Sequence, residues 1–344
     1  MNNTKEIITF IHISDLHLIT NHESVQALYF RKLLNEVIPS LRPDFVICSG
    51  DECNSVGDKN GLSAPILSEW KLYKEMLVDA GYFDPNFWLD IRGNHDAWDE
   101  SGGYLNYYKD YSVSGQYSKG SIYENIYHYN DGSLRVIGFE GCKEIEWCFF
   151  GQIPITILDE LETKLMNKSY STTLLFSHFP LFTLDCTTRS KYGHNIKEII
   201  EFYKPIAYLA GHIHSIMGKH TNYLLNRDTH CFTVNDFKEL GMFRVFTLYK
   251  GILSFHDYTI NDFDKQPIVC LANPKDYRYL TNTEQSLSIS PNDIYIYATS
   301  KNEIKHIKLT IDKHELFVQK SDCQANIYIA HNHILKYIYI ITYS

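Results

Sequence analysis

Short apolar runs alternate with segments of helical periodicity along the first 260 residues. Uninterrupted apolar runs are typical of buried strands, whereas apolar residues spaced three and four apart predict amphipathic helices. We expect strands at 7–13, 45–48, 88–91, 134–139, 173–176 and 206–209, and helices at 24–38, 64–80, 155–166 and 196–203. The stretch 232–258 is predicted to contain strands only. Strands that alternate with helices predict an α/β layered domain.

Turn-forming residues concentrate between positions 260 and 290, in NDFDKQP and TNTEQSLSISPND. Beyond them, apolar and polar residues alternate at 294–298, 304–311, 326–330 and 334–341, which predicts a small all-β module. We therefore expect a first domain at 1–262 and a β-rich C-terminal module at 263–344. The module is short for a seven-strand sandwich of about 100 residues, so we expect an incomplete version of a larger domain.

Composition and charge exclude several classes of protein. The 344 residues are 44% hydrophobic and 21% charged, which excludes a wholly disordered or collagen-like chain. A net charge of −9 gives no signal for nucleic-acid binding, which needs a basic face. We expect no transmembrane segment, because no apolar run approaches about 18 residues. The eight scattered cysteines form no CxxC pair, which favours reduced thiols and a cytoplasmic location.

Residues that bind metals follow five of the predicted strands, where each strand ends. In chain order they are Asp15, His17, Asp51, Asn94, His178, His212 and His214, with His95 and Asp96 next to Asn94. Ligands bind at the carboxyl ends of strands in open α/β sheets, so we expect these side chains to meet at one edge. Carboxylate and imidazole together suit Mn, Fe, Zn, Ni or Co, and a carboxylate can bridge two ions. Gly50, Gly93 and Gly211 allow the backbone to turn sharply there.

The separate motifs differ in how strongly each one favours a metal site. A D-x-H or a GD pair alone is weak, because a helix cap or a surface turn explains each one. GNHD at 93–96 and GHIH at 211–214 are far rarer by chance. Their occurrence in order, each after a predicted strand, favours a metal site over unrelated structural roles. Paired metals lower the pKa of bound water and clamp a displacement at phosphorus, and a histidine can protonate the leaving group.

The order D-x-H, GD, GNHD, SH and GHxH over residues 7–260 resembles the calcineurin-like metallophosphoesterase superfamily. Further segments are similar to the transmembrane protein 62 family, namely EWKLYKEML, WLDIRGNHDAWD, NYYKDYS, AYLAGHIH and PIVCLANPKDY. The resemblance implies a four-layer αββα sandwich with two divalent metal ions (Mn, Fe or Zn), followed by an immunoglobulin-like β module. It also implies a phosphate-ester substrate and, as an alternative to the cytoplasmic location, membrane association.

The resemblance further implies a role for each motif residue. One metal would be held by Asp15, His17, Asp51 and His214, and the other by Asp51, Asn94, His178 and His212, with Asp51 as the bridge. His95 would bind no metal; it would face the substrate beside Asn94 and assist the leaving group, with Asp96 orienting its ring. The implied reaction is hydrolysis of phosphomonoesters or phosphodiesters by a metal-bridging hydroxide.

The sequence departs from the superfamily after Asp51. The superfamily usually continues with a hydrophobic residue, a polar residue and then Asp or Asn, whereas this chain has Glu52, Cys53 and Asn54. A thiol at this place could bind a soft metal, but we expect a packed cysteine. A scaffold that keeps the fold and binds a partner protein is the alternative function. A scaffold has no need of five histidines, which favours catalysis, while substrate and metal identity stay open.

Overall fold

Two β-sheets form the centre of the first part of the chain. The computed structural model describes residues 5–56, 64–97, 107–117, 122–142, 149–214, 222–287, 289–290, 292–311 and 314–331. One sheet has the order β11-β10-β1-β2-β3, from β1 (Ile7–Ile13), β2 (Phe45–Cys48), β3 (Trp88–Asp90), β10 (Met242–Tyr249) and β11 (Ile252–Thr259). The other has the order β4-β5-β6-β7-β9-β8, from β4 (Ile122–Tyr129), β5 (Gly132–Phe139), β6 (Thr172–Phe176), β7 (Ala207–Ala210), β8 (Tyr223–Leu225) and β9 (Thr229–Thr233).

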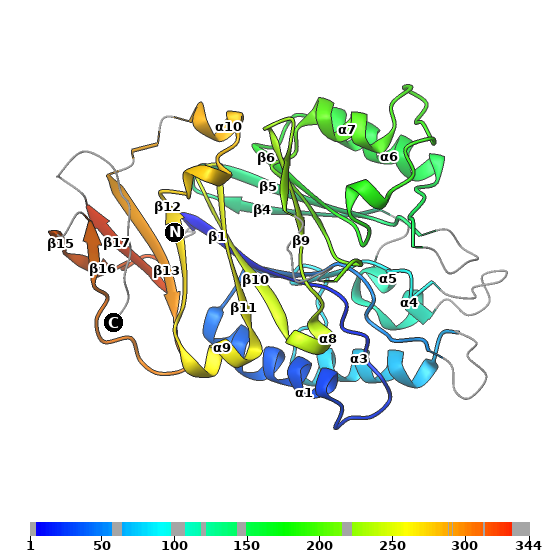
Figure 1. The fold of residues 1–344 in the computed structure, drawn as a ribbon, viewed down its shortest axis with the longest axis horizontal. Helices are drawn as coiled ribbons and strands as arrows, with labels where there is room; N and C mark the ends of the chain where they lie inside the picture. Colours follow the sequence, from blue (N-terminus) through cyan, green and yellow to red (C-terminus); the bar gives the residue numbers. More distant parts are fainter. Residues whose placement is uncertain are drawn as a thin grey trace.

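Helices cover the outer face of each sheet (Figure 1). The first sheet is covered by α1 (Val25–Lys32), the π-helical turn η1 (Leu33–Val37), α2 (Ile38–Leu41) and α3 (Leu67–Asp79). The second is covered by α6 (Ile155–Met166) and α7 (Ile196–Tyr203). The remaining helices of the described chain are α4 (Tyr107–Tyr111), α5 (Val113–Tyr117), η2 (Leu181–Thr183), α8 (Phe237–Leu240), α9 (Ile260–Lys265), η4 (Tyr277–Tyr279) and α10 (Asn282–Gln285).

Alternation along the strands builds three apolar layers between these elements. In β1, Ile7 and Ile11 pack against the helices, while Ile8 and Phe10 pack between the two sheets. Residues of β5 alternate in the same way, with Val136 between the sheets and Ile137 under α6 and α7. Strands buried on both faces need continuous apolar runs, which is why the runs were visible in the sequence. The predicted four-layer α/β sandwich is confirmed.

Parallel pairing brings the predicted strand ends to a common edge. In the first sheet β1 pairs parallel with β2, and β2 with β3. In the second sheet β5, β6, β7 and β9 pair parallel in that order. Loops that follow parallel neighbours leave the sheet on the same side.

Most predicted elements of this part are confirmed, but two predictions are incomplete or wrong. The helix predicted at 24–38 starts after the cap residue Ser24 and continues through η1 into α2. The prediction of strands only at 232–258 is wrong at α8. There the Asp236 side chain accepts a hydrogen bond of 2.9 Å from the Glu239 amide and starts a helix of four residues, too short to show a periodicity. The edge strand β4 was not predicted.

The C-terminal part is rich in β-structure, as predicted. A sheet of order β12-β13-β17-β16 contains β12 (Ile268–Asn273), β13 (Asp293–Thr299), β16 (Val318–Lys320) and β17 (Ile327–His331), beside a pair formed by β14 (Leu309–Ile311) and β15 (His314–Leu316). The predicted strands 294–298 and 326–330 correspond to β13 and β17, whereas 304–311 is a strand only over its last three residues. The strand predicted at 334–341 lies outside the described residues.

The C-terminal sheet packs directly on the first part. Ile268 and Tyr297 belong to the same apolar layer as α1 and α3. The Thr299 hydroxyl donates a hydrogen bond of 2.9 Å to the Ser40 carbonyl at the end of α2, and the Asn326 amide donates one of 3.0 Å to the Leu41 carbonyl. The boundary between 262 and 263 stays a prediction. In the part of the chain described, no helix has the length and apolar character to cross a membrane.

Candidate metal centre

An unusual backbone conformation carries the candidate ligands. Asp15, His17, Asp51, His212 and His214 all have positive φ, between 45° and 70°, although none is glycine. Such residues are uncommon and concentrate at functional sites, where the surrounding structure holds them. Because these residues lie in loops rather than in continuing strands, both members of a D-x-H or H-x-H motif can turn to the same side.

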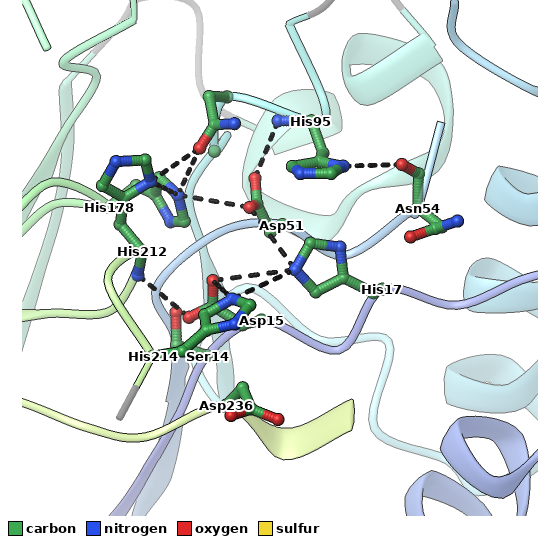
Figure 2. Close-up of polar contacts among 12 residues, drawn as sticks. Ser14, Asp15, His17, Asp51, Asn54, His95, His178, His212, His214 and Asp236 are labelled. Atoms are coloured by element: carbon green, nitrogen blue, oxygen red, sulfur yellow. Dashed lines mark hydrogen bonds and ion pairs between the residues drawn. The ribbon is translucent and has the colours of Figure 1, made fainter. Parts of the chain in front are cut away.

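Three residues gather on one side of the site (Figure 2). The Nε2 atoms of His17 and His214 are 3.4 Å apart. Oδ1 of Asp15 lies 3.1 Å from Nε2 of His214 and 3.8 Å from Nε2 of His17. Their ligand atoms lie within 4.8 Å of one another, so the group could hold a metal ion.

Three further residues gather on the other side. Oδ1 of Asn94 lies 3.0 Å from Nε2 of His178 and 2.8 Å from Nδ1 of His212, and these two ring nitrogens are 3.2 Å apart. The remaining nitrogen of each ring faces a backbone carbonyl, Ser49 at 2.9 Å for His178 and Phe149 at 2.9 Å for His212. Each of those nitrogens therefore carries the hydrogen, which assigns the tautomer of both rings.

The tautomers leave three lone pairs facing one another. Nε2 of His178, Nδ1 of His212 and Oδ1 of Asn94 are all acceptors in neutral side chains, and they converge without a donor. Only a cation or an added proton satisfies such a group. These three atoms therefore form a suitable set of ligands for a metal ion.

Asp51 lies between the two sides. Its Oδ2 is 3.7 Å from Nε2 of His17 and 3.4 Å from Nε2 of His178, and its Oδ1 accepts a hydrogen bond of 2.8 Å from the His95 amide. Gly93 allows this approach, because a Cβ there would overlap the Asp51 carboxylate and its backbone nitrogen. One buried carboxylate thus contacts both histidine groups.

The protonation states suit cation binding. Burial lowers the pKa of His17 to about 3, and burial with the nearby His178 lowers that of His212 to about 4, so both rings are neutral. Burial acts to raise the pKa of Asp51, but the charges of His178 and His95 outweigh it and hold the pKa well below its usual range. Burial also opposes protonation of His178, yet Asp51 and Asp15 raise its pKa to about 9. The buried carboxylates of Asp15 and Asp51 therefore stabilise positive charge in the pocket.

His95 lies beside this centre. Its Nδ1 is 2.6 Å from the Asn54 carbonyl, which makes Nδ1 the donor, and its ring meets the His17 ring edge-on at 4.3 Å between centroids. Asp96, expected to orient this ring, contacts the backbone: it accepts hydrogen bonds from the amides of Asp51 and Gly93, both 2.8 Å, and from those of Glu52 and Cys53. The Asn54 carbonyl thus contacts the His95 ring, and the Asp96 carboxylate braces the loop amides. The expected role of Asp96 in orienting the ring stays a prediction.

A family model described as calcineurin-like phosphoesterase matches residues 8–216. The chain belongs to this family. It is 27% identical over 315 residues to the Mus musculus protein named transmembrane protein 62, covering 88% of this chain and 47% of that protein. The chain thus spans about half the length of this curated relative.

Solved structures with a similar fold include TT1561 of Thermus thermophilus, with a TM-score of 0.47 at 14% identity, covering 74% of this chain and 99% of that one. A 5′-nucleotidase from Candida albicans has a TM-score of 0.46 at 12% identity, covering 82% of this chain and 55% of that one.

The departure from the family pattern after Asp51 has a packing explanation for one residue. Cys53 is fully buried in the apolar layer that contains Leu18 and Trp70, and burial raises the pKa of its thiol well above the usual value. The thiol is therefore a core group, as expected, and among the described residues it belongs to none of the groups that could hold a metal ion. Burial and the neighbouring Asp96 raise the pKa of Glu52, which favours its protonated form.

Three backbone contributors to the site were missed from the sequence. The carbonyl groups of Ser49, Asn54 and Phe149 fix the rings of His178, His95 and His212. Every residue type carries a carbonyl, so no residue type signals this role. The polar side chain of Asn54 drew attention to this loop, but the contact with His95 is made by the backbone carbonyl.

Proposed function

We propose that this chain is a metal-dependent phosphoesterase that binds two divalent ions and hydrolyses phosphomonoesters or phosphodiesters. Membership of the calcineurin-like phosphoesterase family supports the reaction class. The observation that carries the proposal is the convergence of ligand atoms around Asp51, whose carboxylate lies between the ring nitrogens of His17 and His178. A cation on each side would be bound by the carboxylate, imidazole and amide atoms that converge there.

The proposed ligand sets follow the two sides of the site. The first consists of Asp15, His17, Asp51 and His214, and the second of Asp51, Asn94, His178 and His212, with Mn, Fe or Zn as the metal. Two bound divalent ions would supply positive charge for the phosphoryl oxygens and lower the pKa of water in the pocket. Carbonyls that accept from His178 and His212 hold these rings in the ligating tautomer, which is a common arrangement behind metal-binding histidines.

His95 is proposed to protonate the leaving group. The Asn54 carbonyl accepts a hydrogen bond from Nδ1, which leaves the opposite ring nitrogen, Nε2, for proton transfer. The His95 side chain is partly exposed, whereas Asp15, His17 and Asp51 are buried, so a substrate can reach it. Its backbone amide is tied to Asp51, which fixes the distance between acid and ligand.

The test is metal content per chain by mass spectrometry, together with turnover of nitrophenyl phosphate and bis-nitrophenyl phosphate by the same Mn-loaded sample. We expect about two ions per chain and metal-dependent turnover. The better substrate distinguishes monoester from diester hydrolysis. A folded sample without metal and without turnover would contradict the proposal and favour the scaffold alternative.

A further inference from the structure

The segment 149–151 is attached to the candidate metal centre. The Phe149 carbonyl accepts the 2.9 Å hydrogen bond from Nε2 of His212 that assigns the tautomer of that ring. The Phe149 ring also lies beside the His212 ring, with 5.3 Å between centroids, and Phe179 lies at 4.6 Å from the same imidazole. Aromatic rings therefore flank the centre on the side of His212.

Two aromatic side chains of this segment are exposed to solvent. Phe149 is 44% exposed and its neighbour Phe150 is 66% exposed. Their rings meet edge to face, with 5.2 Å between centroids and 83° between planes. Single exposed apolar residues are ordinary on protein surfaces, but two perpendicular rings beside a highly polar pocket form an apolar corner.

Backbone pairing holds this corner in place. The Gly151 amide donates to the Thr183 carbonyl at 3.0 Å, and the Asp185 amide donates to the Gly151 carbonyl at 2.8 Å. A Cβ at Gly151 would lie 2.6 Å from the ring of Phe179, so the segment sits directly on a buried aromatic side chain. The segment is thus packed on the core at Gly151, and the two rings that precede it lie exposed at the surface.

We propose that Phe149 and Phe150 form a subsite that binds a flat aromatic group of the phosphate ester. This inference rests on the proposed function and names the class of substrate. A phosphodiester held at the metal centre with its leaving group at His95 would place its other substituent on the His212 side, against the two rings. A flat ring can lie on the face of one phenylalanine and meet the edge of the other, the arrangements that aromatic pairs favour. A long alkyl chain would extend past a corner made of two side chains.

The experiment compares binding of phenylphosphonate, methylphosphonate and butylphosphonate to the Mn-loaded protein by calorimetry. None of these ligands contains a bond that the proposed reaction hydrolyses, so the readout is independent of turnover. The variant is Phe149→Ala/Phe150→Ala, which keeps the backbone carbonyl that faces His212. Phe317→Ala, at an 82% exposed phenylalanine of the C-terminal part, is the matched control.

We expect the wild type and Phe317→Ala to bind phenylphosphonate roughly tenfold more tightly than methylphosphonate, the scale of partly burying one ring. The double variant should lose this preference and keep its affinity for methylphosphonate. A wild type without the preference, including one that binds no phosphonate, would overturn the subsite, as would a preference that survives in the double variant. An equal preference for butylphosphonate would overturn its selectivity for flat rings. Loss of ester turnover with the phenyl preference intact would count against the proposed function alone.

Discussion

The Asp96 carboxylate accepts a hydrogen bond of 2.8 Å from the backbone amide of Asp51, the carboxylate that lies between the two histidine groups. A second bond of 2.8 Å, from the Gly93 amide, reaches the loop that follows the neighbouring strand. One buried side chain thus joins the loop after β2 to the loop after β3. The positions of Asp51 and Asn94 relative to each other depend on this connection.

We predict that Asp96→Ala lowers the free energy of unfolding by about 3 kcal/mol and reduces metal content, because several buried amides lose their acceptor. Asp96→Asn should cost less, since one acceptor oxygen remains. Urea unfolding and metal analysis check both variants, with Asp276→Ala on an exposed ion pair as the control. Normal stability and metal content, combined with a turnover defect like that of a His95 variant, would instead favour the role of Asp96 in orienting that ring.

Asp51→Asn should lower turnover more than a thousandfold, because it removes the negative charge shared by both sides of the site. The oxygen concerned lies 3.7 Å from His17 and 3.4 Å from His178, so occupancy of both ions should fall. Asp15→Asn is the comparison, since Asp15 lies on the side of His17 and His214 and should affect mainly one ion. Metal stoichiometry of the two variants separates these outcomes, and near-wild-type rates for Asp51→Asn would rule out the bridging role.

His95→Ala should keep both ions and lose turnover by roughly a hundredfold or more on alkyl esters, the usual contribution of a general acid. The loss should be smaller on nitrophenyl esters, whose leaving group needs little protonation. The ratio of the two rates, measured with metal content, distinguishes a proton donor from a ligand. Because His17, Asp51 and His95 also form a group that could hold a metal, loss of an ion in this variant would make His95 a ligand.

Gly211→Ala should reduce metal content, because a Cβ at this position would overlap the Ser14 hydroxyl and the Asp15 carboxylate. The matched control is Gly81→Ala. Gly81 has φ of +78° but open space around it, so substitution costs about 1 kcal/mol of backbone strain and leaves the site intact. Metal analysis and thermal unfolding of both variants check the difference. Equal metal content in the two variants would show that the loop after β7 adapts to the added methyl group.

The location of the site could be predicted from the sequence because parallel strands end at a common edge. Apolar runs marked β1, β2 and β7, and the motif residues followed directly from their ends. The positive φ of Asp15 and His212 could not be predicted, because a non-glycine residue keeps that conformation only where tertiary contacts hold it.

Features that depend on contacts between distant parts of the chain could not be predicted from the sequence either. The edge strand β4 pairs on one side only and leaves Ile126 and His128 exposed, so apolar residues do not mark a single buried face. The carbonyl of Phe149 accepts the hydrogen bond from His212 because its loop passes beside that ring, and the course of a loop does not follow from residue type. The packing of the C-terminal sheet could not be predicted for the same reason: besides apolar contacts, it uses polar side chains, such as Thr299 and Asn326, that reach backbone carbonyls at the end of α2 only in the folded chain.

The pair formed by Lys275 and Glu284 should stabilise the attachment of the C-terminal part. Both side chains are buried, with Nζ 2.7 Å and 2.8 Å from the carboxylate oxygens, and Nζ also lies 2.8 Å from Nε2 of His230 on β9. The Glu284 carboxylate also accepts a hydrogen bond of 3.0 Å from the Leu253 amide on β11. Removing one partner of a buried pair costs about 3–5 kcal/mol, so we predict a loss of about 3 kcal/mol for Glu284→Gln at pH 7.

The stability difference between wild type and Glu284→Gln should depend on pH. Burial acts to raise the pKa of Glu284, but His230 and Lys275 outweigh it and lower the pKa from 4.5 to about 2. A carboxyl with a depressed pKa in the folded state contributes its full stability above pH 4.5, and the contribution is lost as the pH falls through about 2. Urea unfolding at pH 7, 4 and 2.5 should therefore show a shrinking difference. Arg278→Ala, which breaks an exposed pair with Asp276, should change stability by less than about 1 kcal/mol. A difference that stays constant down to pH 2.5 would show that Glu284 contributes through packing and not through its charge.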